Sequence, residues 1–232
     1  MSSFQQSARS RKPRVIRPEV PDHGTITALR AVPRDQDSRG IIIGRKRVAM
    51  LLESDIADLG LRPELELTPE LAEAIACNHE FRLAWRSAML RLSRKARSTR
   101  EIQDGLRRRR HHANVIERVI ARLEHAGLLN DEEYATSAAA SLARQRPAST
   151  RYLESKLRQR GIEPATAAKA AKEAAGDPLE AAVKLARQAM RSLRSCDPQT
   201  RHRRLWGRLA RRGFEAEVIN MAIREVEGDS EP

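Results

Sequence analysis

The sequence predicts a mainly α-helical protein in which three tandem three-helix repeats form an elongated, curved stack. A small β-rich N-terminal unit and a disordered basic tail precede the stack. Two observations lead to this fold class. Apolar residues at helical spacing fill the chain from residue 68 onward, and one pattern recurs with a period of about fifty residues. Units of that size cannot bury an apolar stripe alone, so they stack on their neighbours.

The register of the repeat is consistent across several kinds of residue. A shift of 51 residues places Leu106 on Leu157, and a further shift of 52 places Leu157 on Leu209. The second shift also places Gly161 on Gly213. Three unrelated helical hairpins that share a turn are the alternative, but they do not explain why apolar, glycine and arginine positions agree together. Further matches are Ser98-Thr99-Arg100 with Ser149-Thr150-Arg151, and Ile102 with Leu153 and Leu205.

The predicted domains follow from this register and from changes in composition. They are a disordered basic tail at 1–22, a β-rich unit at 23–67, a long helix with the first repeat at 68–126, the second repeat at 127–176, the third repeat at 177–227 and a frayed tail at 228–232. The N-terminal tail carries five basic residues and three prolines with little apolar content. Such a segment cannot offset the entropy lost on ordering.

The β-rich unit has strand-like runs separated by turn residues. Thr25–Leu29 and Ile41–Ile43 are β-prone, and residues 44–46 form a turn into Val48–Leu52. Leu65 and Leu67 would add a last strand. No motif in this unit suggests chemistry.

The long helix begins at Thr68-Pro69-Glu70, which supplies a cap, a proline in the first turn and an acid. Its apolar pattern continues to Ser93, and we expect a break near Asn78. The second part would open the first repeat. His79 is isolated on this helix, and we expect it to be solvated.

The remaining helices are bounded by caps and glycines. In the first repeat, Ser98 or Thr99 caps a helix that four arginines close, and the next helix ends at Gly127. Asn130 or Asp131 caps the one that follows. The expected helices of the second repeat are 131–144 and 150–160, followed by an alanine-rich helix after Pro164; those of the third are 178–193, one from Pro198 to Gly213, and 215–227.

Composition restricts the possible function classes. The net charge is +13, and only seven of the 44 basic residues are lysine. Arginine's planar fork suits phosphate and carboxylate, so a nucleic acid or an acidic protein surface is the expected partner. Cys77 and Cys196 lack a CxxC or histidine spacing and read as reduced thiols. No run reaches the roughly 20 apolar residues of a membrane span, so we expect a soluble, cytoplasmic protein without membrane contact.

Enzymatic and metal chemistry find no support in the sequence. Glycine-rich phosphate loops, Ser/His/Asp sets and paired acids at a plausible site are absent, so we expect no enzyme and no cofactor. His111 and His112 are adjacent and would face different ways on a helix end, which argues against a metal site. Trp206 lies beside Leu205 and Leu209 and is expected to pack rather than stack on a base.

The candidate binding residues are outward-facing arginines. At 100° per residue, Arg100, Arg151 and Arg203 fall about 140° from the core, whereas Arg109, Arg160 and Arg212 fall about 40° from it and have a structural role. A solvated charged face is the alternative for the outward set. Local excess favours binding, because residues 201–212 hold six arginines and no acid. The predicted set is Arg94, Arg97, Arg100, Arg107, Arg108, Arg151, Arg158, Arg203, Arg204 and Arg211.

Residues 91–226 resemble the RecX family of recombination regulators. The resemblance rests on the entry from Arg94 to Ser98, the junction Gly127-Leu128-Leu129-Asn130-Asp131-Glu132-Glu133-Tyr134-Ala135, and the turn Leu157-Arg158-Gln159-Arg160-Gly161-Ile162. It implies a monomer that lodges in the groove of the RecA recombinase filament, inhibits its ATPase and strand exchange, and binds single- or double-stranded DNA weakly. This chain departs from the pattern where Arg110-His111-His112 replaces the turn glycine and where the third helix of repeat two is mostly alanine.

The residues alone are also compatible with a second function class. Helix, glycine turn and helix at 151–175 are similar to a helix-turn-helix, which would make the chain a nucleic-acid-binding regulator. Binding of one defined operator sequence would favour that class. Inhibition of a single-strand-dependent recombinase ATPase would favour the first.

Overall fold

A computed structural model of the chain describes residues 17–33 and 35–228. These residues divide into two compact units. The first unit holds the chain up to Ser93 together with Gln103–Arg122, and the second holds Arg94–Ile102 and the chain from Leu123 onward.

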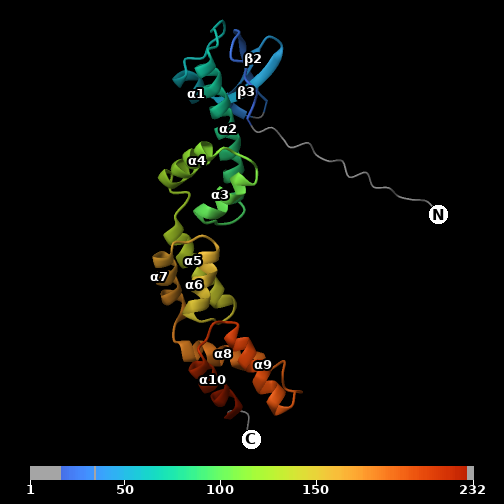
Figure 1. The fold of residues 1–232 in the computed structure, drawn as a ribbon, viewed down its shortest axis with the longest axis vertical. Coiled ribbons are helices and arrows are strands. Elements are labelled where there is room, and N and C mark those ends of the chain that lie inside the picture. Colours follow the sequence, from blue (N-terminus) through green and yellow to red (C-terminus); the bar gives the residue numbers. More distant parts are fainter. Residues whose placement is uncertain (1–16, 34, 229–232) are drawn as a thin grey trace, which may run out of the picture. The chain divides into compact units, whose positions relative to one another are not determined.

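A three-stranded antiparallel sheet opens the first unit, as the sequence predicted. Its strands are β1 (Ile26–Val32), β2 (Asp35–Ile43) and β3 (Lys46–Leu52), paired in chain order. Figure 1 shows α1 (Glu53–Asp58) and α2 (Pro69–Leu92) beside this sheet. The core between them is apolar and includes Ile26, Ile41, Leu51 and Ile75.

The predicted last strand at Leu65 and Leu67 does not form. Glu66 forms an isolated antiparallel bridge to Thr25, and the Ile26 N–H donates to the Leu65 carbonyl at 3.0 Å. A positive φ of 68° at Glu64 interrupts the extended backbone before this bridge. Leu67 contributes a buried side chain to the core. The alternating leucines therefore mark a buried segment whose backbone pairing is too short to be a strand.

Helix α2 runs without the break expected near Asn78. Thr68 caps it, its hydroxyl accepting the Leu71 N–H at 3.3 Å, and neither glycine nor proline interrupts residues 70–92. His79 is not solvated as expected: it is half-buried, and its Nδ1 accepts the Met50 N–H at 2.9 Å. The polar residues around Asn78 therefore do not end the helix, and α2 packs against β3.

The middle helices of the three repeats end in the same turn. These helices are α3 (Thr99–Arg107), α6 (Thr150–Gln159) and α9 (Pro198–Ala210). In the first, the His111 N–H donates to the Leu106 carbonyl at 3.3 Å. The equivalent bonds run from Ile162 to Leu157 at 3.2 Å and from Phe214 to Leu209 at 3.4 Å. Residues related by the shifts of 51 and 52 positions in the sequence therefore form the same backbone turn.

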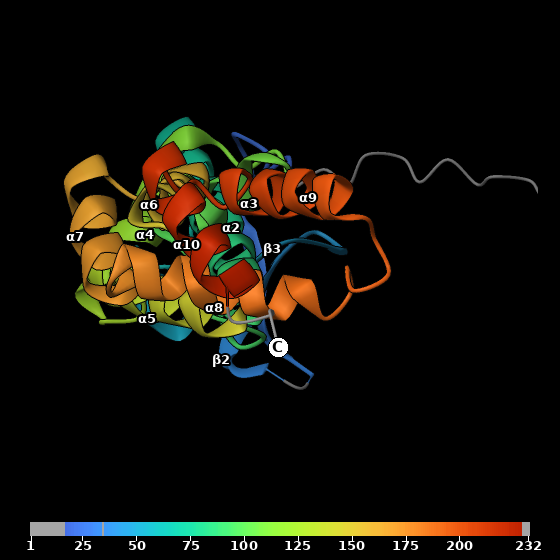
Figure 2. The same cartoon turned by 90° about the horizontal axis from the view of Figure 1, so that it is seen from below.

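Two three-helix bundles in the second unit correspond to two of the predicted repeats. Helices α5 (Asp131–Gln145) and α7 (Pro164–Ala175) pack with α6, and α8 (Pro178–Met190) and α10 (Ala216–Gly228) pack with α9. Figure 2 shows α8, α9 and α10 side by side. Helix α4 (Ala113–His125) follows α3 and buries Val115, Ile116 and Val119.

Most of the two predicted tails lie outside the described residues. Within the N-terminal segment, Arg17 forms an ion pair with Glu73 of α2, and Val20 packs against the core of the sheet. At the other end, α10 extends to Gly228, and residues 229–232 are outside the description.

Candidate functional site

Neighbouring repeats in the second unit meet at two equivalent contacts, which we call joint 1 and joint 2. At joint 1, the Ser98 hydroxyl at the start of α3 donates to the carbonyl of Arg160 after α6, at 2.5 Å. At joint 2, the Ser149 N–H at the start of α6 donates to the carbonyl of Arg212 after α9, at 3.1 Å. Ser98 and Ser149 are equivalent in the repeat, and so are the turns that they contact. Each middle helix therefore docks its first turn onto the end of the next.

Both joints bring a helix start against a turn glycine. Gly161 has φ of 86° and Gly213 has φ of 77°, values that favour glycine. A Cβ on Gly161 would lie 2.2 Å from Cδ and 2.4 Å from Cβ of Arg100, and one on Gly213 would lie 2.6 Å from Oγ of Ser149. At both positions, glycine therefore permits the left-handed backbone of the turn and leaves space for the helix start that packs against it.

Polar side chains fix the start of α3 in joint 1. The Ser98 Oγ accepts the Glu101 N–H at 3.2 Å while the Glu101 carboxylate accepts the Ser98 N–H at 3.2 Å, which is a capping box. The Asp131 carboxylate accepts the Thr99 N–H at 2.8 Å. Asn130, the first of the two predicted candidates, caps α5, its amide oxygen accepting the Glu132 and Glu133 N–H groups at 3.1 Å.

Three predicted arginines line a shallow recess at joint 1. Arg100, Arg151 and Arg158 meet there around Gly161, and all three are exposed. The same recess includes the acids Glu154 and Glu163. Glu154 lies 3.6 Å from the Arg158 guanidinium, so part of this positive charge is already neutralised.

Three further predicted arginines gather on α9. Arg203, Arg204 and Arg211 line a recess above Gly207, together with Arg208. A second recess at joint 2 shares Arg208 and Arg211 and adds Arg146 and Arg212, which the sequence analysis did not assign to binding. Its remaining lining residues are Leu185, Gln188 and Ala189, none of which is acidic. Arg146 was missed because it lies at the end of α5, outside the repeated arginine positions.

The remaining predicted arginines have individual surroundings. Arg94 is exposed, and Arg97 is half-buried with its guanidinium 3.3 Å from Glu101. Arg107 and Arg108 are exposed and belong to the first unit, where Arg107 lies 3.1 Å from Asp104. Arg94, Arg97 and the two recess groups all belong to the second unit.

The arginines predicted to be structural divide into two kinds. Arg160 donates to the Tyr134 hydroxyl at 3.3 Å, and the Arg212 guanidinium carbon lies 4.8 Å from the centre of the Tyr152 ring. Arg109 is instead exposed, because α3 ends at Arg107 and the backbone turns before it. The expected packing of Trp206 is also wrong. Its side chain is 40% exposed because its neighbours on α9, Leu205 and Leu209, occupy the buried face.

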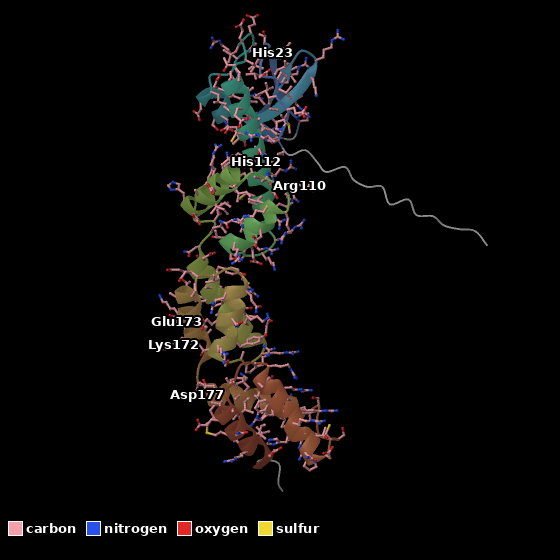
Figure 3. The ribbon with its side chains drawn as sticks, in the orientation of Figure 1. His23, Arg110, His112, Lys172, Glu173 and Asp177 are labelled. Atoms are coloured by element: carbon pink, nitrogen blue, oxygen red, sulfur yellow. The ribbon has the colours of Figure 1, made fainter. Side chains whose placement is uncertain are left out.

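The first-repeat turn replaces glycine with arginine and buries a histidine. Arg110 has φ of 64°, so it adopts the same left-handed conformation as Gly161 and Gly213. His111 occupies the position of Ile162 and Phe214 and is consequently buried. Burial lowers the pKa of His111, and the nearby Glu80 opposes this shift. Figure 3 labels Arg110 and His112 at this turn.

Glu80 of α2 brings the two histidines together, contrary to the expectation that they face different ways. Its buried carboxylate lies 2.7 Å from Nδ1 of His112 and 3.5 Å from Nδ1 of His111, and it accepts the His112 N–H at 2.6 Å. The residues share a turn, not a helix end, which explains the difference. Among the described residues, no group of three or more metal-ligating side chains is assembled. No helix in the same residues is long and apolar enough to cross a membrane.

Comparison with protein families matches all three helical segments. Family models described as the first, second and third three-helix domains of RecX match residues 84–123, 130–170 and 176–223. The "Regulatory protein RecX" of Amycolatopsis mediterranei is 34% identical over 135 residues, covering 58% of this chain and 77% of that protein. The protein of the same name from Corynebacterium efficiens is 36% identical over 149 residues, covering 61% and 70%.

A solved structure is similar to the fold as a whole. The structure titled "Crystal structure of regulatory protein RecX" matches with a TM-score of 0.69 and 23% identity, covering 85% of this chain and 98% of that one. At that level of identity the match concerns the fold alone.

Proposed function

Because this chain belongs to the RecX family of regulatory proteins, we propose that it binds the filament that the RecA recombinase forms on DNA. Binding inhibits the ATPase activity of the filament and its strand exchange, and it takes place in the cytoplasm. The protein acts as a regulator without catalysis of its own. The observation that carries the proposal is the clustering of exposed arginines in the recess at joint 1 and on α9.

The proposed contact set is the predicted one, from Arg94 to Arg211. A filament repeats the same surface once per subunit, so we propose that repeated arginines bind it at several points, through acidic patches, nucleic-acid phosphates, or both. Each exposed ion pair contributes less than about 1 kcal/mol. Useful affinity therefore requires many simultaneous contacts, and it decreases as salt screens them.

Replacement of Arg100, Arg151 and Arg203 together by alanine tests this assignment. The wild-type protein should suppress single-strand-dependent ATP hydrolysis by the recombinase, and the triple variant should suppress it less while retaining its helical circular dichroism. Because the stem of Arg100 covers Gly161, a second triple variant with Arg100→Gln keeps an aliphatic stem there. Inhibition equal to wild type in both variants would refute the assignment.

A control that removes two positive charges, against three in the arginine variants, is available on α7. Lys169→Gln with Lys172→Gln removes two positive charges from exposed positions of the same unit, and Figure 3 labels Lys172 on this helix. Neither lysine belongs to the proposed contact set. Loss of inhibition in this control as large as in the arginine variants would show that net charge alone is responsible.

The helix-turn-helix alternative has less support from the residues of α7. As the second helix of that motif, α7 would read bases with its first exposed turns. The exposed positions there are Pro164, Ala165, Ala168 and Lys169, of which Lys169 alone offers a side-chain hydrogen-bond donor to a base edge. Binding to one defined operator in preference to random DNA would favour this alternative.

A further inference from the structure

We propose that the recess at joint 2 is a phosphate-binding site formed by Arg146, Arg208, Arg211 and Arg212. The four arginines line one hollow between the end of α5 and the second half of α9. This site goes beyond the proposed function, because it requires no recombinase and because three of its four arginines (Arg146, Arg208 and Arg212) lie outside the predicted contact set.

Among the described residues, no carboxylate lines this recess to balance its positive charge. Within the described part of the chain, none of the four arginines pairs with a carboxylate. The recess at joint 1 differs, because Glu154 and Glu163 line it and Glu154 lies 3.6 Å from Arg158. Like charges that converge without an acid favour an anion from outside the chain.

Neutral groups hold two of the guanidinium groups in place. Arg208 donates to the Ser192 hydroxyl at 3.0 Å, and Arg212 lies over the Tyr152 ring with 4.8 Å between its guanidinium carbon and the ring centre. A hydroxyl and an aromatic face orient a guanidinium without cancelling its charge. The Arg212 carbonyl is fixed at the same time by the Ser149 N–H at 3.1 Å. The arginines are therefore partly oriented before any ligand arrives.

The composition of the recess favours phosphate over carboxylate. One arginine already satisfies a carboxylate through two parallel hydrogen bonds, whereas phosphate groups offer more oxygens and repeat along a nucleic acid backbone. The hollow also contains Leu185 and Ala189, which give an apolar wall beside the guanidinium groups. This apolar wall suits the sugar or base that accompanies a phosphate in a nucleotide.

The direct test compares three probes on the full-length protein without recombinase. The probes are a short fluorescein-labelled single-stranded oligonucleotide followed by anisotropy, sodium pyrophosphate as its competitor at constant ionic strength, and a glutamate-rich peptide as an acidic control. The test variant is Arg146→Gln with Arg208→Gln. The charge-matched control is Lys169→Gln with Lys172→Gln.

In the test variant we expect oligonucleotide binding to weaken by at least tenfold and to depend less on salt. Removal of two phosphate contacts on a single strand should reduce the slope of log K against log salt by roughly 1.4. The lysine control should bind nearly as wild type. Arg208→Lys keeps the charge but loses the fork, so it should fall between wild type and the test variant; this single change also covers the case in which the double variant does not fold.

The outcomes also identify the source of the phosphate. Displacement of the oligonucleotide by pyrophosphate at this site indicates that free phosphates bind as well, whereas no displacement beyond that of chloride indicates the nucleic acid backbone. The proposal is overturned if the test variant binds like wild type or weakens no more than the lysine control. It is equally overturned if the glutamate-rich peptide competes as well as pyrophosphate.

Discussion

Joint 1 and joint 2 connect the same two parts of the repeat but differ in their donor and in their electrostatics. In each, a serine at the start of a middle helix donates a hydrogen bond to the carbonyl before a turn glycine, through the Ser98 hydroxyl at joint 1 and the Ser149 N–H at joint 2. Joint 1 surrounds its arginines with Glu154 and Glu163, whereas the lining of the joint 2 recess, among the described residues, has Gln188 and no acid. Repetition therefore keeps the position of the contact, while the groups that form and surround it differ. The same turn in the first repeat uses Arg110 and a buried His111 in place of glycine and an aliphatic residue.

The largest expected effect comes from adding a methyl group at the joints. Gly161→Ala and Gly213→Ala should each cost about 1–2 kcal/mol for the left-handed backbone and about 1–3 kcal/mol more for overpacking against the docked helix. Gly161→Ala should be the worse, because its Cβ would approach Arg100 to 2.2 Å. Urea unfolding followed by circular dichroism measures both.

Gly127→Ala is the control for this pair. Gly127 has φ of 66°, but nothing lies within 4 Å of its would-be Cβ, so only the backbone cost applies. If all three variants lose the same stability, the close approach at the joints contributes nothing.

A lower pH should reduce the free energy of unfolding through the first-repeat turn, which has Arg110 and His111 instead of a glycine and an apolar residue. The pKa of His111 is lowered from its ordinary value of 6.5, mainly by burial, and the pKa of His79 is lowered for the same reason. The unfolded chain therefore binds these protons more readily than the folded chain. The contribution of these two histidines to the free energy of unfolding is fully present above about pH 6.5. It decreases as the pH falls below that value toward their folded-state pKa values.

Thermal unfolding of wild type and His111→Ile at pH 7.5 and pH 5.5 checks this expectation. Isoleucine matches Ile162 at the equivalent position and cannot be protonated, so the variant should lose less stability on acidification. An equal loss in both proteins would assign the acid sensitivity to other groups.

Glycine at the first turn should have a smaller effect with the opposite sign. Arg110→Gly removes the cost of a side chain at φ of 64° and should raise the free energy of unfolding by up to about 1 kcal/mol. The same urea titration measures it. A destabilised variant would mean that the Arg110 side chain makes a contact more valuable than the backbone strain.

The smallest expected effect comes from a substitution that gives joint 2 an acid, as joint 1 has. Gln188→Glu places a carboxylate in the recess and should stabilise the fold by about 0.5 kcal/mol at low salt, a gain that screening removes at high salt. Gln188→Leu, which adds no charge, is the comparison. A gain that is independent of salt would indicate packing instead of ion pairing.

The repeats were predictable from the sequence because apolar spacing and turn glycines report local backbone directly. The register that places Leu106 on Leu157 and Leu209 is the register of the observed turns. The joints were not predictable, because they depend on contacts between residues such as Ser98 and Arg160 that lie far apart in the chain. Helical angles placed Arg212 near the core, yet could not reveal the Tyr152 ring beneath it. They placed Arg109 wrongly, since the helix had already ended.

Helix α6 takes part in both joints, giving an amide hydrogen at its first turn and accepting at its last. It has only 10 residues, and a helix of that length is marginal by itself in water. Its persistence therefore depends on what it touches at its two ends. Deuterium uptake along α6 should consequently respond to a lesion at either neighbour, which makes this short segment a sensor of whether the chain of repeats is still connected.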